Sequence, residues 1–189
     1  MQTNRVSDIQ RLVDGGYQIR IPGGTNRGDD TSFACFGAIV RKTIRAHHSY
    51  FEIVVVPYMP KNIPTESIEQ SFSETKEGTL EREIIEETGI LAKVYYEIAQ
   101  MSIPDNSSQN NMHIKYAFLI EDYDASNIRC NLSASQPELG IPLWIPLNLL
   151  EKYIFEGHRW ILAPLKEYLG YFGKKIPTHH PSKRFIEAS

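Results

Sequence analysis

The stretch REIIEETGI at residues 82–90 constrains this chain more than any other feature, because it places three carboxylates on one turn of a predicted helix. Glu83, Glu86 and Glu87 stand at positions i, i+3 and i+4, which share one face of an α-helix. Gly89 follows where a helix commonly ends in a left-handed residue. Like charges this close repel one another, so an ordinary surface helix gains no stability from them.

A divalent cation is the ligand that this spacing predicts. Mg²⁺ prefers oxygen ligands and keeps several of its own water molecules, so glutamates on one helical turn suit it. An acidic cluster can also be the solvated face of a surface helix. The flanking residues favour the metal site, since Arg82 directly precedes the first glutamate and Glu74 lies eight residues before that arginine.

Together these residues resemble the Nudix box, whose pattern is G-x5-E-x7-R-E-U-x-E-E-x-G-U, with U a bulky aliphatic residue. The residues that occupy their positions in register are Glu74, Arg82, Glu83, Ile84, Glu86, Glu87, Gly89 and Ile90. The leading glycine is replaced by Ile68, and residues 67–74 (SIEQSFSE) contain no glycine. A residue without a Cβ permits a tight turn, so we expect an altered loop around an intact metal site.

The resemblance extends over about residues 32–169 and implies a fold of the α/β (α+β) class, an α/β/α sandwich around a mixed β-sheet. It implies that Glu83, Glu86 and Glu87 bind Mg²⁺ or Mn²⁺, and that Glu86, Glu83 and Arg82 serve catalysis. Helical geometry is expected to direct Arg82 away from the metal face. In the family this arginine pairs with the glutamate equivalent to Glu74, so both would support the site. An ordinary surface salt bridge is the alternative for this pair.

The implied reaction is hydrolysis of the pyrophosphate bond in a nucleoside diphosphate linked to another group X, giving a nucleoside monophosphate and X-phosphate. A bound metal would lower the pKa of water and produce a nucleophile near neutral pH. Glu86 is the general base that the box suggests, and Glu138, Glu121 and Asp122 are the alternatives. Sugar nucleotides such as ADP-ribose, dinucleoside polyphosphates and nucleoside triphosphates remain open as substrates, with a preference for a nucleotide sugar or similar diphosphate.

Aromatic residues offer a weak indication of where a nucleobase would bind. Tyr50 and Phe51, together with Phe33, could stack on a base through their ring faces. Aromatic residues on strands more often belong to the core, which is the alternative interpretation.

A function of a different class also stays open. Some Nudix domains have lost catalysis and act as nucleotide-ligand sensors or interaction modules. Ile68 in place of the glycine favours this alternative, whereas the intact set Glu83, Glu86 and Glu87 opposes it.

The remaining composition indicates one globular domain that contains residues 1–189. A hydrophobic content of 41% is ordinary, and the net charge of −3 gives no general reason to bind nucleic acid or anionic membranes. The four basic residues of the polar tail at residues 173–189 are interrupted by prolines, which makes a weak nucleic-acid footprint. The polar start of the chain, short apolar runs and two isolated cysteines, Cys35 and Cys130, favour a cytoplasmic protein without disulfides. A homodimer is left open.

Local patterns predict mixed secondary structure. The expected helices cover about residues 7–15, 75–88, 147–155 and 158–169, and the expected strands cover 17–21, 32–41, 50–58, 90–103, 113–121 and 143–147. Pro22, Gly23 and Gly24 are expected to end the first strand, and residues 59–73 to form a long loop before the acidic helix.

Overall fold

The computed structural model describes residues 6–27, 32–45, 48–60, 74–104, 112–128, 138–170 and 184–185. The helices in these residues are α1 (Val6–Asp14), α2 (Lys76–Thr88), α3 (Leu147–Tyr153) and α4 (Leu162–Tyr168), with the 3₁₀ helix η1 (Glu156–Ile161) before α4. The strands are β1 (Gln18–Arg20), β2 (Gly23–Thr25), β3 (Phe33–Arg45), β4 (His48–Tyr58), β5 (Leu91–Pro104), β6 (Met112–Asp124), β7 (Leu143–Pro146) and β8 (Arg184–Phe185).

The strands form one mixed sheet in the order β1-β4-β3-β6-β5-β8, with β2 paired to β3 and β7 paired to β4. Strands β3 and β6 run parallel, and the other pairs are antiparallel. The edge of β3 that faces away from β6 has two partners. Strand β2 pairs with residues 34–36 at the start of β3, and β4 pairs with residues 40–45 towards its end. The N-terminal segment therefore lies against the beginning of β3.

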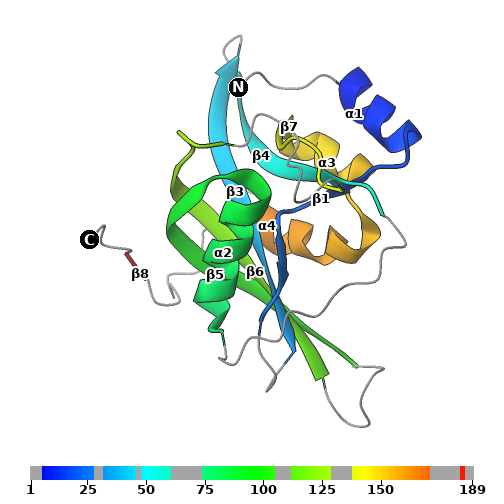
Figure 1. The fold of residues 1–189 in the computed structure, drawn as a ribbon. Coiled ribbons are helices and arrows are strands. Elements are labelled where there is room, and N and C mark those ends of the chain that lie inside the picture. Colours follow the sequence, from blue (N-terminus) through cyan, green and yellow to red (C-terminus); the bar gives the residue numbers. More distant parts are fainter. Residues whose placement is uncertain are drawn as a thin grey trace.

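Helices cover both faces of the sheet. Leu80 and Ile84 of α2 are fully buried and pack with Ile39, Phe118 and Trp144 on one face. The other face carries a second buried cluster, to which α1, α3, η1 and α4 contribute together with β1. Figure 1 shows α2 on one side of the sheet and α3 with α4 on the other. The α/β/α sandwich around a mixed sheet that the sequence indicates is confirmed.

Most predicted elements are present with shifted ends, and two differ in kind. Gly23 and Gly24 belong to strand β2 instead of ending the first strand, because residues without a Cβ allow the backbone to lie close to β3. The helix expected at residues 158–169 is divided into η1 and α4. Helix α1 begins at Val6, one residue before its expected start.

Several predictions concern residues outside the described part of the chain. These are Ile68 with most of the loop at residues 59–73, Cys130, and most of the polar tail. Cys35 is buried and free, and burial is the largest cause that raises the pKa of its thiol to about 12. Across the described helices, none is both long enough and apolar enough to cross a membrane.

Candidate functional site

Helix α2 is capped at both ends, by Thr75 and by the expected Gly89. The hydroxyl of Thr75 accepts a hydrogen bond from the backbone N–H of Gly78 at 3.1 Å, as an N-cap residue does. Gly89 ends the helix with a φ of 72° and donates its N–H to the carbonyl of Ile85 at 2.8 Å. With Leu80 and Ile84 buried against the sheet, the acidic face is turned to one side of the helix.

Glu74 and Arg82 form the ion pair that the sequence predicts. Arg82 donates through Nε to Oε1 of Glu74 at 2.8 Å and through Nη2 to Oε2 at 2.9 Å, so the pair is bidentate. Their side chains are only 12% and 16% exposed. Glu74 also accepts from the hydroxyl of Thr79 and from the backbone N–H of Arg27, each at 3.0 Å. The pair is therefore a half-buried anchor for the residues before α2, and it is not an ordinary surface salt bridge.

The expectation that Arg82 points away from the acidic face is wrong. Its Nη1 donates to Glu83 at 2.6 Å and to Glu86 at 3.2 Å, so the guanidinium lies among the carboxylates. Long side chains reach across one turn of a helix, and the bidentate contact with Glu74 draws this one over the acidic face. Arg82 thus joins Glu74 to two of the three candidate metal ligands.

Strand β2 and the residues after it complete the site, and the sequence pattern alone did not identify them. The backbone N–H of Gly23 donates to Glu87 at 2.7 Å. Gly24 faces Glu83 so closely that an added Cβ would lie 2.6 Å from its carboxylate carbon. Arg27 donates through Nη2 to Glu86 at 3.0 Å. The signal in the sequence was the run Pro22-Gly23-Gly24 with Arg27 three residues later, but this segment lies about fifty residues before the box.

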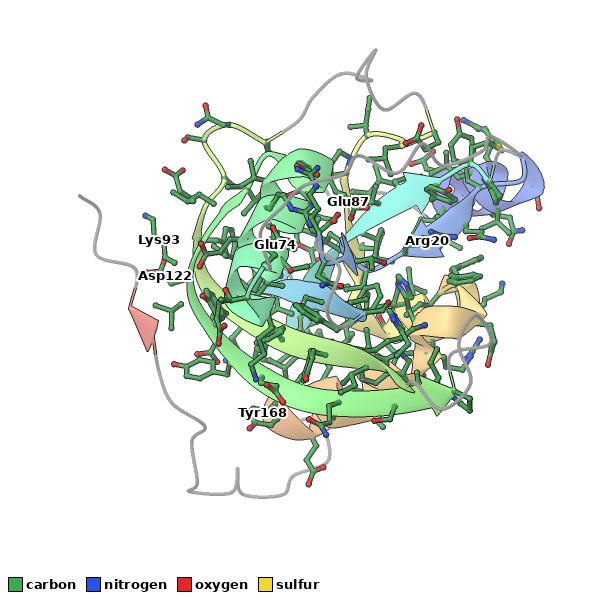
Figure 2. All side chains as sticks on the ribbon, turned by 60° about the horizontal axis from the view of Figure 1, so that its bottom comes forward. Arg20, Glu74, Glu87, Lys93, Asp122 and Tyr168 are labelled. Carbon is green, nitrogen blue, oxygen red and sulfur yellow. The ribbon has the colours of Figure 1, made fainter. Side chains whose placement is uncertain are left out.

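A third cation, Arg20 of β1, lies near enough to Glu87 to interact with its charge. The charge of Glu87 acts to raise the pKa of Arg20 against the larger effect of burial, which lowers it. Its guanidinium carbon lies 3.7 Å from the ring centre of Tyr58 and 4.7 Å from that of Phe155. A cation between two ring faces is held in place while its charge is preserved. In Figure 2, Glu74 and Glu87 lie near α2 in the middle of the molecule, and Arg20 projects to one side of them.

The charges of the site are strongly coupled. Hydrogen bonding from Arg82 is the largest cause that lowers the pKa of Glu74 to about 2. Burial is the largest cause that raises the pKa of Glu83, with repulsion from Glu86 adding to it and Arg82 opposing it. Burial lowers the pKa of Arg82, but its contacts with Glu74 and Glu83 outweigh that effect and raise the pKa overall. Glu86 is 32% exposed, so it is half-buried.

The donor chemistry of this face suits a hard divalent cation, since Glu83, Glu86 and Glu87 offer only carboxylate oxygens. Their present arrangement is not a finished metal site. In the part of the chain that the structure describes, no three acidic, histidine or cysteine side chains converge as a metal-binding group. The carboxylates are turned towards Arg82, Arg27 and the Gly23 amide instead. Side-chain rotation would be needed before these three residues could hold a cation together.

Tyr50 and Phe51 lie away from this cluster. They pair with Thr43 and Lys42, about 25 Å along β3 from the residues that pair with β2. Phe51 and Phe33 pack against the two apolar clusters. Phe33 and Phe51 therefore take part in the packing of the core.

The three alternative bases are divided between two regions. Glu121 and Asp122 are exposed on β6, and Figure 2 shows Asp122 beside Lys93 at the edge of the molecule, far from Glu74 and Glu87. The backbone carbonyl of Glu138 accepts from Met59 at 2.8 Å, directly after Tyr58 and therefore close to the ring that covers Arg20.

Comparison with known proteins rests on structure. No family model and no curated protein matches the sequence. The solution structure of the E. coli ORF135 protein is similar, with a TM-score of 0.50 and 13% identity over 84% of this chain and 95% of that one. A MutT NUDIX hydrolase from Burkholderia pseudomallei gives a TM-score of 0.46 and 16% identity over 72% and 99% of the two chains. The NUDIX domain of Shewanella oneidensis NrtR, complexed with ADP ribose, gives a TM-score of 0.47 and 13% identity over 71% of this chain and 87% of that one.

The likeness to the ORF135 protein concerns the arrangement of the backbone, and the box residues give a second, independent indication of the family. The described elements form the α/β/α sandwich, and the box residues Glu74, Arg82, Glu83, Glu86 and Glu87 are joined by hydrogen bonds at α2. On both grounds, the chain has the fold of the Nudix family.

Proposed function

We propose that this protein hydrolyses the pyrophosphate bond of a nucleoside diphosphate linked to a group X, and that it requires Mg²⁺ or Mn²⁺. The observation that carries the proposal is the half-buried acidic face of α2, where Glu83, Glu86 and Glu87 lie against β2 with two arginines among them. Keeping several carboxylates together is costly without a cation. A helix that served only to stabilise the fold would gain nothing from three neighbouring carboxylates.

The chain's own residues would divide the chemistry among them. Water adds an oxygen to one phosphorus atom, the bridging P–O bond breaks, and the proton from the water passes to a carboxylate. Glu86 is our candidate for this base, because it is partly exposed while Arg82 keeps it in position. When bound, the metal would neutralise phosphate charge and activate the water. Glu138, later in the chain, is the alternative general base.

Arg20 is our candidate for binding the substrate's phosphates. It lies beside the acidic face and its position is held by Tyr58, Phe155 and a hydrogen bond to Gln18. A guanidinium recognises phosphate through its fixed fork of donors. The outer faces of these rings offer a stacking surface for a base. The preferred substrate class remains a nucleotide sugar or a similar diphosphate.

The test is release of phosphate esters from a panel of nucleoside diphosphate derivatives with Mg²⁺ or Mn²⁺, followed with a coupled phosphatase. We expect Glu86→Gln to lower kcat by roughly 100-fold or more, because the base and a metal ligand are lost together. Glu77→Gln is the matched control. It removes a glutamate from the same helix, two and a half turns before Glu86 and so on the opposite side, and it should retain wild-type turnover.

Equal turnover by Glu86→Gln and the wild type would refute the proposed metal-dependent reaction. No turnover on any compound with either cation would favour the second candidate, a catalytically impaired Nudix domain that senses a nucleotide ligand. The contacts that Arg27 and Arg82 make with Glu86 are the observation that keeps this second candidate open.

The proposed partner is a small nucleotide ligand. We propose neither a nucleic acid nor a membrane as partner, we place the protein in the cytoplasm, and we leave a homodimer open. Among the described helices none has the length and apolar character of a membrane span.

A further inference from the structure

Both carboxylate oxygens of Glu86 are already engaged. Oε1 accepts from Nη2 of Arg27 at 3.0 Å, and Oε2 accepts from Nη1 of Arg82 at 3.2 Å. Each oxygen keeps a second lone pair that could bind a cation, but a cation bound there would lie beside two guanidinium charges. Release of one guanidinium from Glu86 would therefore favour cation binding.

Arg27 is the one that is able to move. Arg82 is 16% exposed and is fixed by its bidentate contact with Glu74 and by further contacts with Glu83 and the carbonyl of Thr25. The side chain of Arg27 is 38% exposed, and Glu86 is the only acidic residue in the described part of the chain with which it forms an ion pair. Releasing it costs little, because a partly exposed pair is weak.

The backbone of Arg27 is held by contacts that do not involve its side chain. Its N–H donates to Oε2 of Glu74 at 3.0 Å. The preceding residue, Asn26, is tied to Phe33 by a backbone and a side-chain hydrogen bond, each of 2.9 Å. A guanidinium released from Glu86 would therefore remain beside the acidic face, where the phosphates of a metal-bound substrate would lie.

The charges of the cluster favour such an exchange. Glu74, Glu83, Glu86 and Glu87 contribute four negative charges when ionised, whereas Arg27, Arg82 and the nearby Arg20 contribute three positive charges. The acidic face therefore keeps a net negative charge even with its arginines in place. A cation at this face frees Arg27 from its role as a counterion, and a diphosphate then supplies the anion that Arg27 needs.

We propose that Arg27 is an exchangeable counterion: it occupies Glu86 in the absence of a cation, competes with the cation for that carboxylate, and then binds a phosphate of the diphosphate substrate. The inference rests on the proposed function, since it assumes a cation at Glu86. It assigns Arg27 a role in coupling metal binding to substrate binding.

The first measurement is Mn²⁺ affinity without any nucleotide, from the free Mn²⁺ signal in electron paramagnetic resonance. We expect Arg27→Gln to bind Mn²⁺ about fivefold more tightly than the wild type, because the competing charge is gone. Arg27→Lys keeps the charge and should remain close to the wild type. Arg159→Gln removes an exposed arginine that pairs with Glu156 on η1 and should have no effect.

The second measurement is calorimetric binding of α,β-methylene-ADP, a diphosphate that resists hydrolysis, at a saturating Mn²⁺ concentration for each variant, where the cation occupies Glu86 and Arg27 is released. Arg27→Gln should bind it at least about fivefold more weakly, since a charged donor to the phosphates is lost. Tighter Mn²⁺ binding with weaker nucleotide binding supports the exchange.

Two outcomes overturn the inference, and they differ in what they say of the proposed function. If the wild type binds Mn²⁺ and Arg27→Gln binds Mn²⁺ equally or more weakly, the exchange is refuted. Equal nucleotide binding by the two proteins refutes it as well. In both cases the proposed hydrolase function stands. If no variant binds Mn²⁺ at all, the metal-dependent hydrolase falls together with it.

Discussion

At the scale of single residues, Gly24 lies where any side chain would meet the carboxylate of Glu83, 2.6 Å from an added Cβ. The leading glycine of the box pattern is absent at position 68, and here a glycine fifty residues before Glu74 packs against the first glutamate of the acidic face. Close approach of β2 to α2 therefore depends on a residue far outside the motif.

Gly24→Ala should destabilise the protein by roughly 1–3 kcal/mol, because the added methyl group overlaps the Glu83 carboxylate and forces it or β2 to shift. The measurement is urea unfolding at neutral pH. A double-mutant cycle provides the control. In a Glu83→Ala background the carboxylate is gone, and Gly24→Ala should then cost less than about 1 kcal/mol. An equal loss of stability in both backgrounds would show that the added methyl group clashes with a residue other than Glu83.

At the scale of secondary-structure elements, η1 holds the segment between β1 and β2 in place. The N–H of Ile21 donates to Nδ1 of His158 at 3.1 Å, so Nδ1 is the unprotonated ring nitrogen. The ring packs at 4.5 Å on Phe36. Burial, followed by the charges of Arg20 and Lys115, lowers the pKa of His158 to about 3. Gly23, two residues after Ile21, is thereby directed towards Glu87.

His158 should make stability depend on pH between 7.5 and 5. Its pKa in the fold is about 3, below the ordinary value of 6.5, so the unfolded chain binds the proton more readily. The contribution of neutral His158 to the stability of the fold is therefore fully present above pH 6.5 and is lost as the pH decreases towards 3. The loss by pH 5 is roughly 2 kcal/mol, which urea unfolding at both pH values would reveal.

His158→Leu tests the assignment of this pH dependence. The variant should be less stable at pH 7.5, since the Ile21 N–H loses its acceptor, but it should show little further loss down to pH 5. His48→Gln, which changes an exposed histidine, should retain the wild-type dependence. A wild-type slope in His158→Leu would assign the effect to another group.

At the scale of the whole molecule, the two helical layers share one sheet. Strand β3 contributes Phe36, Ala38 and Val40 to one apolar cluster and Cys35 and Ile39 to the other. Because successive residues of a strand point to opposite faces, neither layer can lose its packing without disturbing the strands that support the other.

Unfolding should therefore be a single cooperative transition, even for variants that damage one layer. Leu80→Ala in α2 and Leu165→Ala in α4 each remove a fully buried side chain and should cost roughly 2–5 kcal/mol. Near- and far-ultraviolet circular dichroism should melt together in both variants. Separate transitions in Leu165→Ala would show that the α4 layer unfolds by itself.

Local chemistry in the sequence determined much of this protein. The limits of α2, its caps and its acidic face follow from neighbouring residues, because helix periodicity and capping act over only a few positions. The Glu74–Arg82 pair was likewise predictable from the motif. Alternation along the strands and the box motif together indicated the layered fold.

Only the tertiary structure decided what faces those carboxylates. Gly23, Gly24 and Arg27 reach α2 because β2 pairs with the beginning of β3, a contact that no local pattern encodes. Arg82 turned towards Glu83 and Glu86, against helical expectation, because its long side chain bonds to Glu74 over the acidic face. Strand pairing and long side chains join residues distant in sequence, so the sequence determined the helix and the fold of the chain determined its surroundings.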